Sequence, residues 1–134
     1  MFLNQLNESN KENFLKLCVY ASLANGVFAK EEKDTLYAYC REMDVEEHIP
    51  ETAETLEEII KTINENTQKS EKNIIILEIL ALVKSDNIFD DKEQEFMKEV
   101  VNGLGLADSC IDKYNELLNK YIEIGRELFL AITN

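Results

Sequence analysis

Residues 24–36, ANGVFAKEEKDTL, align with residues 85–97, SDNIFDDKEQEFM, when the chain is compared with itself at an offset of 61 positions. The alignment extends without a gap over Phe14–Val45 and Ile75–Leu106. Self-similarity at a fixed offset is the signature of an internal repeat. Because the identity between the two stretches is low, the spacing of the apolar residues has to support the comparison.

The spacing of the apolar residues is helical in both copies. Apolar or small residues occupy positions i, i+3, i+4 and i+7, which is the pattern of an amphipathic helix. The matching stripes begin at Leu15 and Ile76, at Leu36 and Met97, and at Leu56 and Tyr114. The third pair is offset by 58 positions rather than 61, so the second copy is three residues shorter before its last helix. Each copy is therefore predicted to contain three helices.

The predicted fold class is all-α: a helical bundle of two pseudo-twofold related three-helix repeats with a C-terminal helical extension. A chain of 134 residues suggests a single domain, 1–134. Repeat one spans about 9–66, repeat two about 69–121, and the extension 122–134. The extension has no counterpart in repeat one and carries several apolar residues. We expect it to continue the last helix and to dock on the bundle or on a partner.

Several helix boundaries have local signals. A Ser, Thr or Asp three residues before a Glu is the pattern of a capping box at a helix start, and a glycine after the last turn commonly ends a helix. The predicted boxes are Ser9–Glu12, Thr55–Glu58 and Asp90–Glu93, and the predicted terminating glycines are Gly26, Gly103 and Gly105.

The charge is strongly acidic, with 27 Asp and Glu residues against 14 Lys and Arg and a net charge of -13. Such a field repels the phosphates of nucleic acids and the surfaces of anionic membranes, and it attracts cations and basic protein surfaces. The acids are densest from Glu42 to Glu58. We therefore expect protein partners, including basic or membrane-associated ones, no direct nucleic acid binding and no membrane insertion.

The sequence contains no recognisable catalytic constellation, and the chain is predicted not to be an enzyme. The single histidine, His48, has no HExxH context, and Gly103 and Gly105 fit helix termination better than a phosphate loop. Cys18, Cys40 and Cys110 form no CxxC pair, and the first two lie on apolar stripes as expected of buried thiols. The N-terminal residues lack the pattern of a signal peptide, so a cytoplasmic location is expected.

Oxygen ligands are concentrated in the turn between the first two helices of the second copy. Asp86, Asp90, Asp91 and Glu93 lie within eight residues, and several such oxygens are what a hard cation such as Ca²⁺ or Mg²⁺ requires. The spacing is not that of an EF-hand, which has twelve residues and a central glycine. We predict a divalent cation site here, with helix capping by Asp90 and Glu93 alone as the alternative.

The equivalent turn of the first copy offers fewer oxygens. Asn25 and Glu32 align with Asp86 and Glu93, whereas Ala29 and Lys30 align with Asp90 and Asp91. Asn25 and Glu32 are thus the candidate ligands of a poorer cation site.

This pair of turns resembles the TerB-like tellurite-resistance family. Members carry an alanine-aspartate-glycine turn after one helix and a glutamate seven residues past that aspartate. The two copies read Ala24-Asn25-Gly26 with Glu32 and Ser85-Asp86-Asn87 with Glu93. Asn25 stands in the first turn where the family has aspartate, which weakens that turn as a metal site, and Asn87 stands in the second turn where the family has glycine. The resemblance covers roughly Phe14 to Tyr121.

The resemblance implies an all-helical bundle of paired repeats and a cytoplasmic bacterial module of stress response or phage defence that recruits partners, with a metal as an optional ligand. Two other functions remain open from the residues themselves. One is an acidic DNA mimic that inhibits a nucleic-acid-binding protein, which would need carboxylates arranged in phosphate-like rows. The other is a small acid–base enzyme, which would need a pocket with carboxylates of separated pKa.

Overall fold

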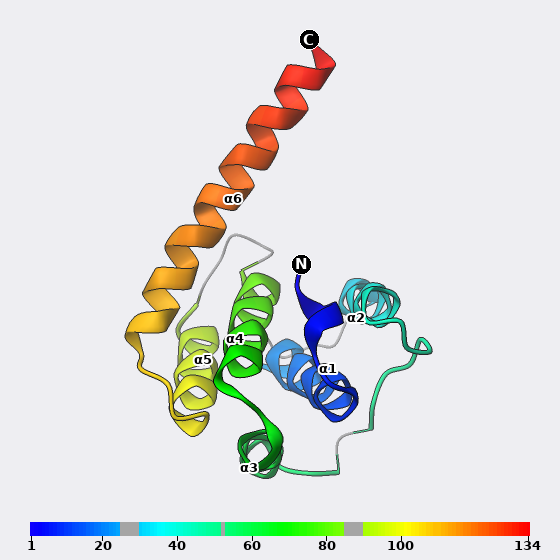
Figure 1. Ribbon diagram of the computed structural model, residues 1–134, viewed down its shortest axis with the longest axis vertical. Helices are drawn as coiled ribbons and strands as arrows, with labels where there is room; N and C mark the ends of the chain where they lie inside the picture. The colour runs from blue at the N-terminus through cyan, green and yellow to red at the C-terminus, as the bar shows by residue number, and fades with distance from the viewer. Residues whose placement is uncertain (25–29, 52, 85–89) are drawn as a thin grey trace.

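The structure is a computed structural model that describes residues 1–24, 30–51, 53–84 and 90–134. This part of the chain contains a short 3₁₀ helix, η1 (Leu3–Gln5), and α-helices but no strand, which confirms the all-α class (Figure 1). The α-helices are α1 (Glu8–Leu23), α2 (Lys30–Glu42), α3 (Leu56–Asn66), α4 (Lys69–Val83), α5 (Asp91–Gly103) and α6 (Ser109–Thr133).

The helix bounds follow the offset that the sequence repeat predicts. Helix α4 begins at Lys69, which is 61 positions after the start of α1 at Glu8, and α5 occupies the span of α2 shifted by the same number. The packing also has a parallel, because α3 lies against α1 as α6 lies against α4. The pseudo-twofold relation between the two halves itself stays a prediction.

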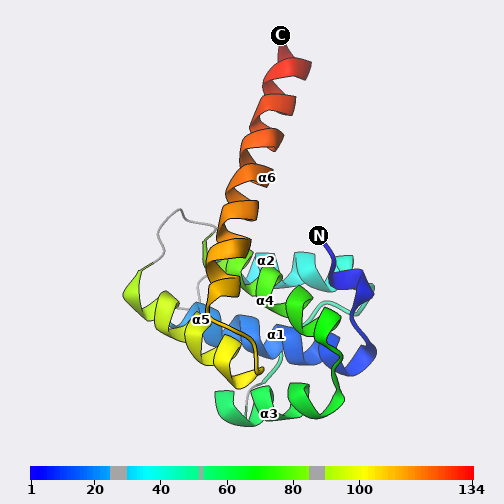
Figure 2. The ribbon, with the colours of Figure 1, turned by 60° about the vertical axis from the view of Figure 1, so that its left-hand side comes forward.

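The core forms where α1 crosses α4, with α3 packed against both α1 and α5 (Figures 1 and 2). Phe14, Leu15 and Leu17 from α1 and Ile75, Ile76 and Ile79 from α4 are all fully buried. Burying one such side chain stabilises the folded state by about 1.5–3 kcal/mol. The apolar stripes found in the sequence are therefore the surfaces that hold the helices together.

Two of the three predicted capping boxes are confirmed and the third is wrong. Both reciprocal bonds are present in Thr55–Glu58 and in Asp90–Glu93. Helix α1 begins two residues earlier than Ser9–Glu12 requires, because the side chain of Asn7 accepts a hydrogen bond from the Asn10 amide at 2.8 Å. Ser9 instead donates its hydroxyl to Asn7 at 3.0 Å.

The glycines predicted to end α5 do so. Helix α5 ends at Gly103, and Gly105 has a φ of +75°, a conformation that other residues rarely adopt. Gly103 also permits a close approach of α5 to α3, since an added Cβ would lie 2.6 Å from Cγ2 of Ile60. Gly26, predicted to end α1, lies outside the described residues.

Helix α6 leaves the bundle. Its first turns rest on α4, where Ile111 and Leu118 are buried, and its later turns extend away from all the labelled helices (Figures 1 and 2). The ammonium group of Lys84 donates hydrogen bonds to the side-chain oxygens of Asn115 and Asn119 and so fixes the base of α6. Residues 121–134 are all exposed. No helix within the described ranges is long and apolar enough to cross a bilayer.

Candidate functional site

Asp90 and Glu93 form a closed pair at the start of α5. Oδ1 of Asp90 accepts the Glu93 amide proton at 2.8 Å, and Oε1 of Glu93 accepts that of Asp90 at 3.2 Å. The Glu93 side chain is fully buried, and it lies four residues before Met97, on the apolar stripe of α5 that faces the core. A buried carboxylate is tolerated here because backbone N–H groups at a helix N-terminus stabilise its charge.

The structure brings only part of the predicted cation site together. Asp91 is exposed in the first turn of α5, and Glu32 is half-buried in the first turn of α2. Asp86 and Asn25 lie outside the described residues. Within the described ranges no three His, Cys, Asp or Glu side chains are grouped closely enough to hold a metal ion. The site around Asp86 therefore stays a prediction.

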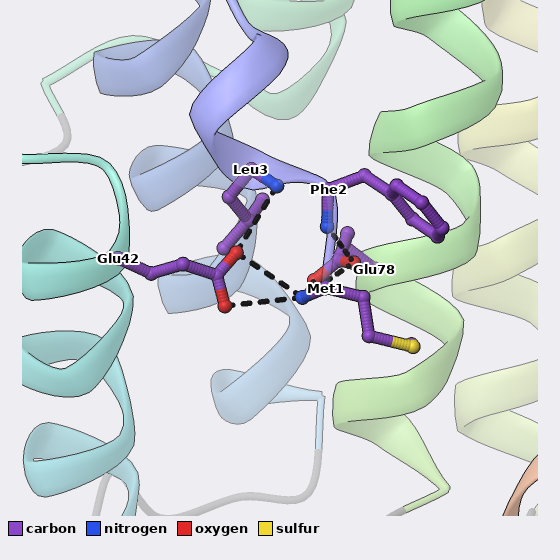
Figure 3. Close-up of polar contacts among 5 residues, drawn as sticks. All are labelled: Met1, Phe2, Leu3, Glu42 and Glu78. Atoms are coloured by element: carbon purple, nitrogen blue, oxygen red, sulfur yellow. Dashed lines mark hydrogen bonds and ion pairs between the residues drawn. The ribbon is translucent and has the colours of Figure 1, made fainter.

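A second carboxylate cluster lies at the N-terminus of the chain as given, between α2 and α4 (Figure 3). The α-amino group of Met1 is 3.0 Å from Oε1 of Glu42 and 3.1 Å from Oε1 of Glu78. The amide of Phe2 donates to Glu78 at 3.1 Å, and the amide of Leu3 donates to Glu42 at 3.0 Å. These bonds fix the first three residues over the bundle.

Glu78 is the charged residue whose role the sequence analysis missed. It is 3% exposed although it carries a carboxylate, and burying an unpaired charge is costly. The repeat contained a signal, because the residue 61 positions earlier is Leu17, which is fully buried. A glutamate at a core position of one copy indicates a partner contributed from elsewhere in the chain.

The Met1 ammonium responds to its surroundings in two opposite ways. Partial burial lowers its pKa, whereas the hydrogen bonds to Glu42 and Glu78 raise it. The net result is a pKa raised above its ordinary value of 8.0, so the ammonium form persists at neutral pH and neutralises the buried carboxylate.

His48 ties the segment between α2 and α3 to α1. Its Nδ1 lies 2.8 Å from the carbonyl oxygen of Glu46, and its Nε2 lies 2.7 Å from Oε2 of Glu12. The hydrogen bond to the Glu46 carbonyl, followed by that to Glu12, raises the pKa of the ring above its ordinary value of 6.5. Both ring nitrogens then donate when the imidazole is protonated.

We expect Glu12→Gln to lower the pKa of His48, because the variant removes a charged acceptor. Protonation of His48 should stabilise the fold fully below pH 6.5, and this contribution should disappear as the pH rises through the raised folded-state pKa. An NMR titration of this single histidine measures the pKa directly. Glu8→Gln on the same helix is the control and should leave the titration unchanged; an identical midpoint in wild type and Glu12→Gln would contradict the prediction.

The segment from Asp44 to Thr55 presents much of the acidic surface. Asp44, Glu46 and Glu51 are exposed on it. Glu47 pairs with Arg41, and Glu54 pairs with Lys16 at 3.0 Å, so local cations offset part of the charge. The remaining exposed carboxylates give this connecting segment an acidic surface.

Two of the three thiols lie in the core. Cys18 and Cys40 are fully buried, as predicted from their stripes. Burial raises the pKa of the Cys18 thiol well above its ordinary value, which suppresses the reactive thiolate.

Comparison with known families identifies the family to which most of the described helices belong. Residues 43–116 match the model of a family described as tellurite resistance protein TerB. The match covers more than half of the chain, from the end of α2 into the first turns of α6. It includes the turn before α5 with Asp90 and Glu93. No curated protein and no solved structure matches the chain significantly.

Proposed function

The chain belongs to the TerB family of tellurite resistance proteins, and on that premise we propose that it is a non-enzymatic interaction module of bacterial stress response, of the tellurite-resistance or phage-defence type. The observation that carries the proposal is the family match, which spans the acidic segment and the turn before α5 together. A cytoplasmic location is part of the same proposal.

The acidic charge supports a protein partner with a basic surface. The net charge of -13 opposes direct approach to DNA or RNA, because few cations are available to replace phosphate counterions. The carboxylates of Asp44, Glu46 and Glu51 are exposed to solvent in the segment that connects α2 to α3. Electrostatic complementarity of this kind increases the association rate with a basic partner and weakens in salt.

The partner half of the proposal is tested by a pull-down from the source cell with two charge-matched variants. Neutralising Asp44, Glu46 and Glu51 to amides should abolish capture, whereas neutralising the exposed Glu95, Glu99 and Glu123 should preserve it. Equal capture by both variants would contradict a role for the acidic segment. Capture of a nucleic-acid enzyme would instead favour an acidic DNA mimic.

We also propose that the turn before α5 binds a divalent cation, with Asp86 and Glu93 as ligands helped by Asp90 or Asp91. Glu93 is fully buried and already accepts the Asp90 amide, so a cation there would add to an organised carboxylate. Ca²⁺ and Mg²⁺ are the cations that carboxylate oxygens prefer.

Calcium or magnesium is expected to raise the melting temperature, because a ligand that binds only the folded state stabilises it by RT ln(1 + [L]/Kd). At about 100-fold excess over Kd the gain is about 2.7 kcal/mol. Asp86→Asn should remove the rise, and a thermal-shift series with each cation measures it.

Glu32→Gln is the matched control, since the aligned first turn has Asn25, Ala29 and Lys30 where the second has three aspartates. This variant should keep the metal response. Absence of a response to either cation at saturating concentration would leave Asp90 and Glu93 as helix caps alone.

A further inference from the structure

Helix α6 carries an apolar stripe along the part that leaves the bundle. Positions a and d of a heptad repeat are occupied by apolar residues over three heptads, which is the pattern of a coiled-coil strand. We name these residues the α6 seam: Tyr114, Leu117, Tyr121, Ile124, Leu128 and Ala131. The central four are 47–62% exposed, so the bundle of the same chain leaves the seam largely uncovered.

Leaving the apolar side of α6 in water is unfavourable for two reasons, the apolar area exposed and the stability of the helix itself. The exposed large hydrophobic side chains of α6 together offer on the order of 800 Å² of apolar surface, about what one partner contributes to a stable protein interface, and the seam residues supply roughly half of it. A helical stretch shorter than about 15 residues is also marginal in water unless it packs against something. Residues 121–133 are helical and exposed, so they lack this stabilisation within the described chain.

We propose that a second copy of this chain covers the α6 seam by antiparallel pairing of the two α6 helices. In an antiparallel pair each a residue faces a d residue of the other copy. The seam then matches itself: Leu117 faces Leu128 of the second copy, Tyr121 faces Ile124, and Tyr114 faces Ala131. All six seam positions are used, whereas the exposed Ile122, Phe129 and Leu130 lie outside the seam.

The charges beside the seam fit the same register. Lys120 and Glu127 occupy successive g positions, and in this register Lys120 of one copy lies beside Glu127 of the other, twice per dimer. A parallel pair would instead place Lys120 beside Gly125. The side chains of residues 119–134 include two basic and two acidic groups, so this part of a chain with net charge -13 is electrically neutral. Two copies therefore meet where their mutual repulsion is smallest.

The base of α6 carries an apolar cavity that can receive the C-terminal part of α6 from the second copy. The cavity has a volume of about 210 Å³. It is lined by Tyr114, Leu117, Leu118 and Tyr121 of α6 together with Met1, Phe2 and Leu77. Leu117 and Leu128 are about 16 Å apart along the helix axis at 1.5 Å per residue. Antiparallel pairing thus brings Leu128 of the second copy to the rim of this cavity.

Gly125 fits the side of the pair that faces the bundle. It occupies an e position and lies opposite Leu118 of the second copy, which is buried against α4. A glycine in a helix interior costs about 1 kcal/mol relative to alanine, and no atom lies within 4 Å of a Cβ added at Gly125. The missing side chain leaves room for the bundle of the second copy.

Sedimentation equilibrium over a concentration series tests the pairing. The wild-type chain should be a dimer. Leu128→Glu places two charges in the seam and should weaken dimerisation by about 100-fold or more. Because Leu128 is exposed, this variant should retain the far-ultraviolet circular dichroism of a folded helical protein. A wild-type chain that is monomeric at all concentrations, or an unchanged Leu128→Glu dimer, would overturn the proposal.

A charge swap tests the antiparallel register. Lys120→Glu and Glu127→Lys should each weaken the dimer by about 10-fold, and the combined variant should restore it. Arg126→Glu makes the same charge change as Lys120→Glu at an f position, outside the seam, and should leave the dimer intact. Additive weakening in the combined variant would overturn the antiparallel register.

Discussion

Replacing Glu78 with alanine is expected to lower the free energy of unfolding by about 3 kcal/mol, near the lower end for breaking a buried ion pair. Glu78 is 3% exposed, whereas Met1, whose amine it binds, is an exposed residue, which places the effect at that end. The loss arises because the Phe2 amide loses its acceptor and the Met1 ammonium keeps only Glu42 as a partner. Urea unfolding followed by circular dichroism measures it.

Two further variants separate the charge from the packing at this site. Glu78→Gln keeps an oxygen that can accept the Phe2 amide proton and should be less damaging than Glu78→Ala. Glu95→Ala removes a carboxylate from the exposed face of α5 and should change stability by less than about 0.5 kcal/mol. A loss for Glu78→Ala as small as that of Glu95→Ala would mean that the Met1–Glu78 pair does not stabilise the fold.

The same pair predicts a pH dependence. Because the pKa of the Met1 ammonium is raised by folding, its contribution is fully present below pH 8.0 and is lost as the pH rises through the raised value. Stability should therefore fall above pH 8.0 in the wild type and fall less in Glu78→Gln.

Phe14→Ala is expected to lower the free energy of unfolding by about 4 kcal/mol, as a large side chain is removed from a packed core. Phe14 is fully buried on α1, and its ring meets that of Tyr39 on α2 edge to face with centroids 5.4 Å apart. Urea unfolding measures the loss. The same change at Phe129, which is 62% exposed, is the matched control and should have little effect.

A double-mutant cycle isolates the ring contact from the burial. Phe14→Leu and Tyr39→Leu, alone and combined, should give a coupling of about 0.5–1.5 kcal/mol between the two rings. A coupling of zero would show that the packing of α1 against α2 is stabilised by the burial of apolar surface and gains nothing from the contact between the two rings.

The local features of this fold were predictable because their causes lie within a few residues. The apolar stripe that begins at Leu36 is recognised from the helical period alone. The Asp90–Glu93 capping box is recognised from two residues that are three positions apart. Both are confirmed. The error at Ser9–Glu12 is local too, since Asn7 is at least as good a cap as serine and lies two residues earlier. For the candidate cation site the sequence predicted the capping pair, and the part that involves Asp86 stays a prediction.

Only the tertiary structure decided which distant groups meet. In the sequence, Glu78 only interrupts an apolar stretch. In the structure, its carboxylate binds the N-terminal amine, which is 77 positions away along the chain. His48 likewise meets Glu12 across 36 positions. The sequence by itself determined the helices, because backbone hydrogen bonds and apolar periodicity are short-range. The packing of those helices determined which charges are buried, what neutralises them and which face of α6 is left to solvent, because these depend on contacts that no short-range pattern encodes.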